Sequence, residues 1–166
     1  MSEQRIGKYV IQSELGRGAM GVVYKAVDPV IGRTVAVKTI RFDLLSDPGS
    51  RDEAHRRFER EAQSAGGLSH PNIVTIYDVG ESDGTTFIAM EFVEGQSLES
   101  LLAAGVRWDA ANAARFAIQL AEALDLAHRK GIVHRDIKPG NILVDHEGRP
   151  HIVDFGIARI ASSTMT

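Results

Sequence analysis

The residues best suited to chemistry lie near the end of the chain. Residues 134–141, with the sequence HRDIKPGN, combine four charged or titratable groups with an amide, between two short apolar segments. The sequence DFG at 154–156 follows a further apolar pair at 152–153. A polar loop between apolar strands usually marks a functional site, although either motif alone could also be a solvated turn.

A second candidate site is the glycine-rich segment 16–21, with the sequence GRGAMG. The GxGxxG pattern is a weak signal, because an ordinary glycine hairpin has the same residues. A dinucleotide-binding fingerprint needs a helix after the last glycine, whereas Val22 and Val23 continue as a strand. A Walker loop needs a lysine where Val22 stands. The segment therefore predicts a hairpin whose glycines let backbone amides approach phosphates, with Val23 as an apolar cover.

The sequence VAVKTI places a lysine inside an apolar strand. Strand alternation puts Lys38 on the same face as Ala36 and Ile40. Burial of its ammonium is costly without a partner, unless the strand lies at an edge and Lys38 reaches water. Glu61 could form a surface pair with Arg57, worth about 0.3–0.5 kcal/mol. Paired with Lys38, it instead supplies the counter-charge that a phosphate-binding ammonium needs.

The composition excludes several classes of function. The 166 residues are 43% hydrophobic and 25% charged, enough for one core or two small lobes. Cysteine is absent, which excludes thiol catalysis, disulfides and thiolate metal sites, and we expect a cytoplasmic location. The formal charge of −3 is spread along the chain, which argues against nucleic acid or an anionic membrane as a partner. No apolar run approaches the roughly 20 residues of a membrane-spanning helix.

Period-2 and helical patterns predict the elements that position the glycine-rich segment and Lys38. We expect an N-terminal lobe over residues 9–93, with a five-stranded antiparallel sheet and one helix. Its first three strands should form a meander. Asp52 and Glu53 suit the acidic start of the helix. The predicted elements are strands at 9–11, 22–27, 34–40, 73–78 and 86–91 and a helix from Asp52 to about Ala65.

The pattern changes to helix after a predicted hinge at 93–95, so we expect a second, mainly helical part over residues 94–166. Asp109 is a good N-cap for a long helix, and Gly131 should end it. The predicted elements are helices at 97–104 and 109–130 and short β segments at 132–133, 142–144 and 152–153.

Taken together, these segments resemble the eukaryotic-type (Hanks-type) serine/threonine protein kinases. The motifs GxGxxGxV, VAVK, HRDIKPGN and DFG occur in the family's order, and the resemblance covers nearly the whole chain, residues 9–159. Lys138, two residues after Asp136, is similar to serine/threonine rather than tyrosine kinases, and HPNIV at 70–74 resembles the bacterial branch. The resemblance implies an α+β, protein-kinase-like fold and transfer of the ATP γ-phosphate to serine or threonine hydroxyls of proteins.

The resemblance also assigns catalytic roles. It implies that Asp136 accepts or orients the proton of the substrate hydroxyl and that Lys138 steadies the γ-phosphate. Lys38, oriented by Glu61, contacts phosphate oxygens. Phosphoryl transfer needs in-line positioning and neutralisation of charge more than covalent chemistry, which suits this set of side chains.

The same resemblance implies the residues that hold the two cofactors, ATP and Mg²⁺. Asn141 and Asp154 are expected to bind magnesium, which prefers hard oxygen ligands. The residues expected around the nucleotide come from the glycine-rich segment, the two apolar walls of the adenine pocket, its back and the hinge. They are Gly16, Gly18, Gly21, Leu15, Val23, Ala36, Leu143, Met90, Glu91 and Val93, together with Lys38.

Arg135, beside Asp136, resembles kinases that are switched by phosphorylation of the activation segment. The candidate acceptors share a serine/threonine-rich tail, which could also be merely solvated: Ser162, Ser163, Thr164 and Thr166. The family's second lobe continues past Thr166. We therefore expect this polypeptide alone to bind nucleotide weakly and to transfer phosphate poorly, and the apolar face of helix 109–130 to favour self-association.

Two other classes of function are alternatives. A pseudokinase-like nucleotide-binding or scaffold module would usually lack at least one of Lys38, Asp136, Asn141 and Asp154, all of which are present. A small-molecule kinase of related architecture is a lesser alternative, which Gly140 does not exclude.

Overall fold

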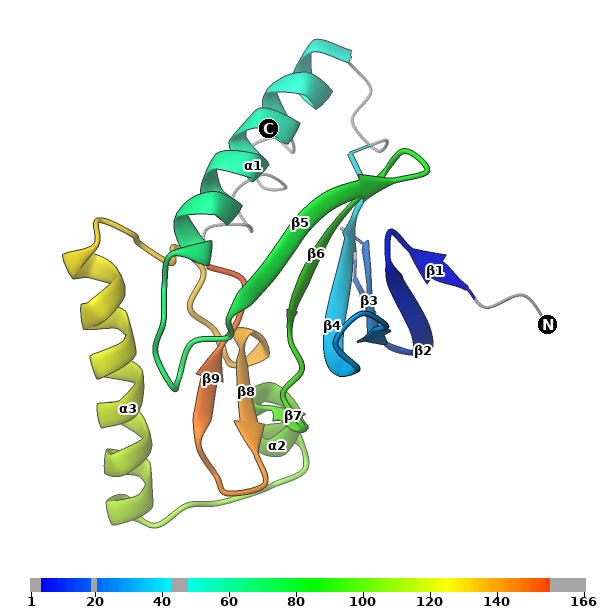
Figure 1. The fold of residues 1–166 in the computed structure, drawn as a ribbon. Coiled ribbons are helices and arrows are strands. Elements are labelled where there is room, and N and C mark those ends of the chain that lie inside the picture. The colour runs from blue at the N-terminus through cyan, green and yellow to red at the C-terminus, as the bar shows by residue number, and fades with distance from the viewer. Residues whose placement is uncertain (1–3, 19–20, 43–47, 156–166) are drawn as a thin grey trace. The chain divides into compact units, whose positions relative to one another are not determined.

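A computed structural model describes residues 4–18, 21–42 and 48–155 (Figure 1). These residues divide into two units. The first contains the described residues up to Arg60 together with Ile76–Phe92, and the second contains Glu61–Thr75 together with the described residues from Val93 onward. Each unit has its own β-sheet.

The sheet of the first unit is antiparallel, with the strand order β1-β2-β3-β4-β6-β5. The predicted meander is confirmed as β2, β3 and β4. Within the described residues this sheet has six strands rather than the expected five, because the two-residue strand β1 pairs with β2. The strands are β1 (Arg5–Ile6), β2 (Tyr9–Gly18), β3 (Gly21–Asp28), β4 (Arg33–Ile40), β5 (Ile76–Ser82) and β6 (Thr85–Glu91).

One face of this sheet carries the apolar core of the unit. Val35 and Val37, which alternation places on the same face of β4, are fully buried there. Tyr9 packs edge-to-face on Phe87 with ring centroids 5.9 Å apart, and its hydroxyl donates to Asp78 Oδ2 at 3.1 Å. Burial and the Asp78 carboxylate together raise the pKa of Tyr9. The remaining buried members of this cluster are Ala26, Phe87 and Ala89. The other face is therefore left for the residues that alternate with this core.

Helix α1 (Pro48–Gly66) begins earlier than predicted. A proline suits the first turn of a helix, where its missing N–H has no partner to lose, so Asp52 and Glu53 lie beyond the first turn. Phe58, Ala62 and Ala65, which recur at helical spacing, are the buried residues among the described side chains of this helix. The helix crosses the division between the units, since its residues up to Arg60 belong to the first unit and those from Glu61 belong to the second.

The second unit contains a small antiparallel sheet of β7 (Gly95–Ser97), β8 (Ile142–Asp145) and β9 (Pro150–Ile152). Helices α2 (Leu98–Ala103) and α3 (Ala110–Arg129) confirm both predicted helices. Asp109 Oδ1 accepts the N–H of Asn112 at 2.7 Å, as an N-cap should. A short 3₁₀ turn, η1, spans Pro139–Asn141.

The predicted β segment at 132–133 is wrong. Gly131 adopts a φ of 75°, and the N–H of Ile132 donates to Ala127 O at 2.9 Å. This bond closes the C-terminal end of α3, so Ile132 completes a helix rather than a sheet. The predicted segment at 152–153 is shifted to β9, and the strand predicted from residue 73 begins at Ile76, because Ile73 makes an isolated bridge with Ile152.

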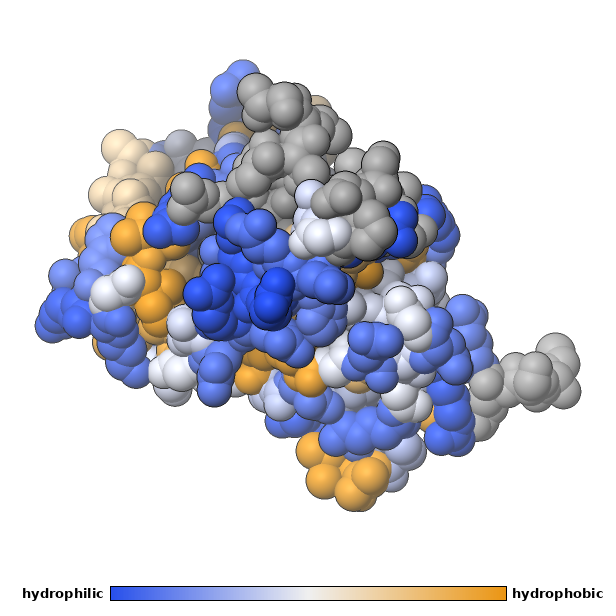
Figure 2. All heavy atoms as spheres, turned by 90° about the horizontal axis from the view of Figure 1, so that it is seen from above, coloured by the Kyte–Doolittle hydropathy of each residue, from blue (hydrophilic) through white to orange (hydrophobic). Residues whose placement is uncertain are grey.

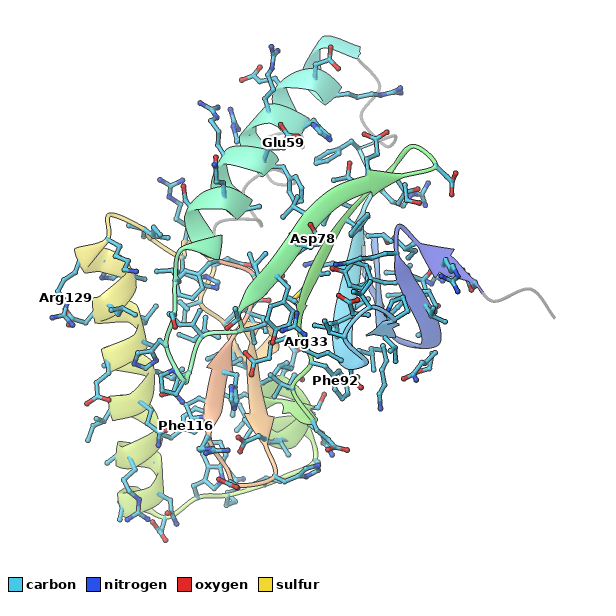
Figure 3. The ribbon with its side chains drawn as sticks, in the orientation of Figure 1. Arg33, Glu59, Asp78, Phe92, Phe116 and Arg129 are labelled. Atoms are coloured by element: carbon cyan, nitrogen blue, oxygen red, sulfur yellow. The ribbon has the colours of Figure 1, made fainter. Side chains whose placement is uncertain are left out.

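The core of the second unit lies between α3 and β8. Phe116 points from α3 toward the small sheet (Figure 3) and packs with Ile142 and Val144. The buried stripe of α3 is narrower than predicted, because Ala113 and Ala117 are exposed. Self-association through this helix stays a prediction.

Hydrogen bonds of Asn72 hold the HPNIV segment, residues 70–74, within the second unit. Its buried side-chain amide donates to Pro150 O at 2.7 Å and to Gln119 Oε1 at 3.2 Å. The N–H of Ile152 also donates to Asn72 O at 2.8 Å. One side chain therefore joins this segment to both α3 and β9.

The face drawn in Figure 2 is mostly hydrophilic, with separate hydrophobic patches. Among the helices of the described residues, none is long and apolar enough to cross a membrane.

Candidate active site

His134 anchors the polar loop that follows α3. Its ring is almost fully buried and stacks edge-to-face on Phe155, with centroids 4.7 Å apart. Its Nδ1 accepts the N–H of Asp136 at 3.2 Å, so Nε2 carries the proton and donates to Val153 O at 2.7 Å. The histidine thus ties the HRD motif to the segment that leads into DFG.

The carboxylate of Asp136 is held by two neighbours within the same loop. Lys138 Nζ lies 3.0 Å from Asp136 Oδ2, and Asn141 Nδ2 donates to the same oxygen at 2.9 Å. The hydrogen bond from Lys138 holds the pKa of Asp136 below its ordinary value, aided by Asn141 and opposed by partial burial. An ionised carboxylate with a low pKa is a weak base, so this geometry suits orientation of a hydroxyl better than early removal of its proton.

Asn141 is a buried residue whose side-chain orientation is fixed. Both of its hydrogen bonds to Asp136 use Nδ2, so within the described residues its Oδ1 is the atom left to accept or to ligate. Its backbone carbonyl accepts the N–H of Val153 at 3.0 Å, which links it to the residue before Asp154. The part of the chain that the structure describes contains no group of three His, Cys, Asp or Glu side chains able to hold a metal by itself. Two oxygen ligands fit Mg²⁺, which usually keeps phosphate and water ligands in addition.

Arg135 and Asp154 both have a positive φ, of 68° and 62°. Non-glycine residues rarely adopt this conformation, which costs on the order of 1–3 kcal/mol. Arg135 precedes the predicted catalytic residue Asp136, and Asp154 is itself a predicted metal ligand. Strain of this kind at neighbouring loops is typical of a functional site.

The three glycines of the glycine-rich segment differ in what the fold demands of them. A Cβ on Gly21 would lie 1.8 Å from the backbone oxygen of Thr39, so the packing of β3 on β4 requires glycine there. A Cβ on Gly16 or Gly18 would meet nothing within 4 Å. Glycine at these two positions leaves room for another molecule to approach the backbone, as phosphate binding requires. Residues 19–20 of the segment lie outside the described residues.

The register of β3, β4 and β6 gathers the predicted nucleotide-binding residues of the first unit on one face. Val23 pairs with Lys38, and Ala36 pairs with Met90. This face is opposite the apolar core, which confirms the predicted alternation of Lys38 with Ala36. Strand β4 lies between β3 and β6, so the alternative in which Lys38 sits on an edge strand is wrong.

Four further predicted nucleotide-binding residues lie outside these strand pairs. Leu15 is exposed and lies at a bulge of β2. Glu91 ends β6, and Val93 follows it outside any regular strand or helix. Leu143 belongs to the second unit, where it is partly buried on β8 opposite His151. Their joint contact with one nucleotide stays a prediction.

Glu61 lies in the second unit and is partly buried on α1. Arg57, its alternative partner, forms an ion pair with Glu53 at 3.2 Å. The pairing of Glu61 with Lys38 stays a prediction. Gly156 and the candidate phosphorylation sites, Ser162, Ser163, Thr164 and Thr166, lie outside the described residues.

The sequence analysis did not predict two contacts of the site. Thr39 contacts the return strand of the glycine-rich hairpin through its side chain. Gly95 allows β7 to approach β8, since a Cβ there would lie 2.1 Å from Val144 O. The sequence feature that could have indicated the first contact is a polar residue, Thr39, in the apolar strand VAVKTI. For the second contact it is the glycine beside the predicted hinge, Gly95.

Comparison with known proteins agrees with this geometry. The chain matches the protein kinase domain family over residues 9–166. PrkC, a serine/threonine-protein kinase of Bacillus subtilis, is 48% identical over 158 residues, which cover 95% of this chain and 24% of PrkC. The probable serine/threonine-protein kinase SCO3848 of Streptomyces coelicolor is 46% identical over 165 residues, covering 96% of this chain and 24% of that protein.

Solved structures give the same result for the fold. The kinase domain of PknI from Mycobacterium tuberculosis matches with a TM-score of 0.82 and 31% identity, covering 100% of this chain and 68% of that one. The apo form of PpkA-294 matches with a TM-score of 0.84 and 26% identity, covering 99% of this chain and 66% of that one.

The chain therefore belongs to the protein kinase family, in its bacterial Hanks-type serine/threonine branch. It carries part of the catalytic domain, and it spans about a quarter of the length of the curated relatives it matches, 24% for both proteins named above. The predicted family and fold are confirmed.

Proposed function

We propose that this chain provides the groups that transfer the γ-phosphate of ATP to serine or threonine hydroxyls of proteins, with Mg²⁺ as the metal. The observation that supports this most is the Asp136 carboxylate, held by Lys138 at 3.0 Å and by Asn141 at 2.9 Å. A carboxylate fixed on one oxygen by two donors presents its other oxygen in a defined direction, as a positioned catalytic group must.

On the nucleotide side, the face of the first sheet that carries Val23, Ala36 and Met90 would contact the adenine. The open space at Gly16 and Gly18 would admit the phosphates to the backbone amides. Lys38, on the same face, would donate its ammonium to phosphate oxygens. Glu61 would orient that ammonium.

On the acceptor side, Asp136 would accept the hydrogen bond of the substrate hydroxyl and aim its oxygen at the γ-phosphorus. Lys138, already bonded to that carboxylate, would stay beside the transferred group and balance its negative charge. Asn141 Oδ1 and the Asp154 carboxylate would hold Mg²⁺, which neutralises charge on the phosphate oxygens when it is bound. Lys138 and Asn141 lower the pKa of Asp136 and so favour its ionised form, which can accept the hydrogen bond of the substrate hydroxyl.

Substitution of Asp136 by Asn in the natural protein that contains this chain tests the proposal. The substitution keeps the size of the side chain and removes its charge. Phosphate transfer from radiolabelled ATP to a generic protein substrate should fall by about 10²-fold or more, while Mg·ATP affinity should stay within about threefold.

Asp125→Asn provides the matched control, because Asp125 is exposed on α3 and pairs there with Arg129. Its transfer rate should equal that of the wild-type protein. Unchanged transfer in Asp136→Asn would contradict the proposed role of Asp136. Tight Mg·ATP binding without transfer in the wild-type protein would favour the nucleotide-binding scaffold instead.

A further inference from the structure

The backbone ladder between β3 and β4 stops beside Lys38. Among the described residues, the pairs between these two strands run from Asp28 and Arg33 to Val23 and Lys38, where the ladder ends. Strand β4 itself continues, since Thr39 and Ile40 still pair with β6. Gly21 and Val22, the first residues of β3, pair with β2, so any attachment of theirs to β4 must be made without a backbone ladder.

The side chain of Thr39 supplies that attachment. Its hydroxyl oxygen accepts the N–H of Val22 at 3.0 Å and donates to the carbonyl of Val22 at 3.1 Å. One hydroxyl thus satisfies both backbone groups of Val22, as a paired strand residue would. Both residues are buried, so water cannot easily replace these bonds.

Gly21 completes the attachment, because a Cβ at this position would lie 1.8 Å from Thr39 O. The backbone of the hairpin therefore lies directly against β4, one residue after Lys38. At the other arm of the hairpin, Gly16 and Gly18 have open space around them. The contacts of Gly21 and Val22 with Thr39 therefore determine the position of the hairpin relative to β4.

We propose that Thr39 is a positioning residue for phosphate binding, which sets the height of the glycine-rich hairpin over Lys38. This inference rests on the proposed function of the hairpin as the phosphate cover. If Thr39 had a purely structural role, loss of its hydroxyl would weaken the binding of ATP and of adenosine equally, or would weaken neither. A positioning role weakens the contribution of the phosphates and spares that of adenosine.

The first experiment needs no ligand and compares amide hydrogen exchange by NMR in the 166-residue chain. In Thr39→Val, which keeps the shape but removes the hydroxyl, exchange at Val22 should accelerate by about tenfold or more, because both of its backbone groups lose their partner. Thr39→Ser should retain the slow exchange. Thr34→Val, the same change on the exposed start of β4, serves as the control and should not alter Val22. Unchanged exchange at Val22 in Thr39→Val would overturn the proposal.

The second experiment measures the affinities of the same variants for Mg·ATP and for adenosine by titration calorimetry or fluorescence. Thr39→Val should weaken Mg·ATP binding by about 3- to 10-fold and adenosine binding by less than about twofold. Thr39→Ser should restore the difference between the two ligands. Equal losses for both ligands, or no loss, would overturn the positioning role.

The two proposals fail in different ways. A wild-type chain that binds Mg·ATP no more tightly than adenosine would contradict the proposed function of the hairpin. The exchange at Val22 would then still decide whether Thr39 holds the hairpin. A wild-type preference for Mg·ATP that Thr39→Val leaves intact would contradict only the role of Thr39.

Discussion

Asn141 donates its side-chain amide to Asp136 twice, to the backbone carbonyl at 2.8 Å and to Oδ2 at 2.9 Å. The predicted metal ligand and the predicted catalytic carboxylate are therefore one hydrogen-bonded unit. A change at either residue should alter the other.

Asn141→Asp should raise the pKa of Asp136, because a second carboxylate would replace the amide donor next to Oδ2. Carbon-13 NMR of the side-chain carboxyl groups follows this titration directly. The pKa of Asp145, whose carboxylate is held by His151 and Arg149, should not change and serves as an internal reference. An unshifted Asp136 would contradict the hydrogen-bonded unit described above.

Lys138→Met should also move the pKa of Asp136 back up toward its ordinary value of 3.8, since Lys138 is the main cause of the lowered value. In the wild-type chain the folded-state pKa of Asp136 lies below the unfolded one. Asp136 therefore adds stability above the unfolded pKa, and this stability is lost as the pH falls through the folded pKa.

The Lys138→Met chain should accordingly lose less stability than the wild-type chain between about pH 5 and pH 2, as measured by urea unfolding at several pH values. The same loss in both chains would mean that Lys138 does not set the charge state of Asp136.

Asp145→Asn should destabilise the second unit by about 1–3 kcal/mol at neutral pH. Burial by itself would raise the pKa of Asp145, but hydrogen bonds from His151 and Arg149 lower it well below the ordinary range. In the wild-type chain, the contribution of the Asp145 carboxylate to the free energy of unfolding is lost as the pH falls through its folded-state pKa. The asparagine variant has no carboxylate at this position and should lack this pH dependence. Thermal unfolding over a pH series measures both effects, and identical pH dependence in the two chains would contradict them.

Gly21→Ala and Gly16→Ala should separate folding from binding. The added methyl group at position 21 would collide with Thr39 O, so unfolding free energy should fall by about 2 kcal/mol or more. At position 16 the methyl group has open space, and stability should change by less than about 0.5 kcal/mol, while Mg·ATP affinity falls. Denaturant unfolding with and without Mg·ATP gives both quantities. Equal stability of the two variants would show that Gly21 is not required by the packing.

Local signals in the sequence were sufficient for the two later helices. Asp109 caps α3 and Gly131 ends it, and both act through hydrogen bonds within a few residues. The meander of β2, β3 and β4 was predictable for a similar reason, since its alternation and turn residues are local. The start of α1 was not predicted correctly, because the acidic pair at 52–53 is a weaker signal for a helix start than the proline at 48.

Elements that depend on distant partners escaped prediction. Strand β7 is short and exists through its pairing with the distant strand β8. Strand β1 pairs with the neighbouring strand β2, but its two residues are too few to show an alternating pattern. Ile73 was assigned to a strand of the first unit, whereas its bridge to Ile152 belongs to the second. In the site, the motifs and the family resemblance predicted Lys38 and Asp136 as functional residues. It could not reveal that His134 and Thr39 hold the loops in place, because those contacts depend on packing.

We predict that one metal-bound nucleotide contacts both the glycine-rich hairpin and the loops around Asn141 and Asp154. Addition of Mn²⁺ and ATP to the labelled 166-residue chain tests this by NMR, since Mn²⁺ replaces Mg²⁺ and broadens nearby amide signals even when binding is weak. Broadening of Gly16, Gly18, Asn141 and Asp154 in the same titration, dependent on ATP, is the predicted result. Broadening confined to the hairpin, or to the two loops, at saturating ATP would contradict the account.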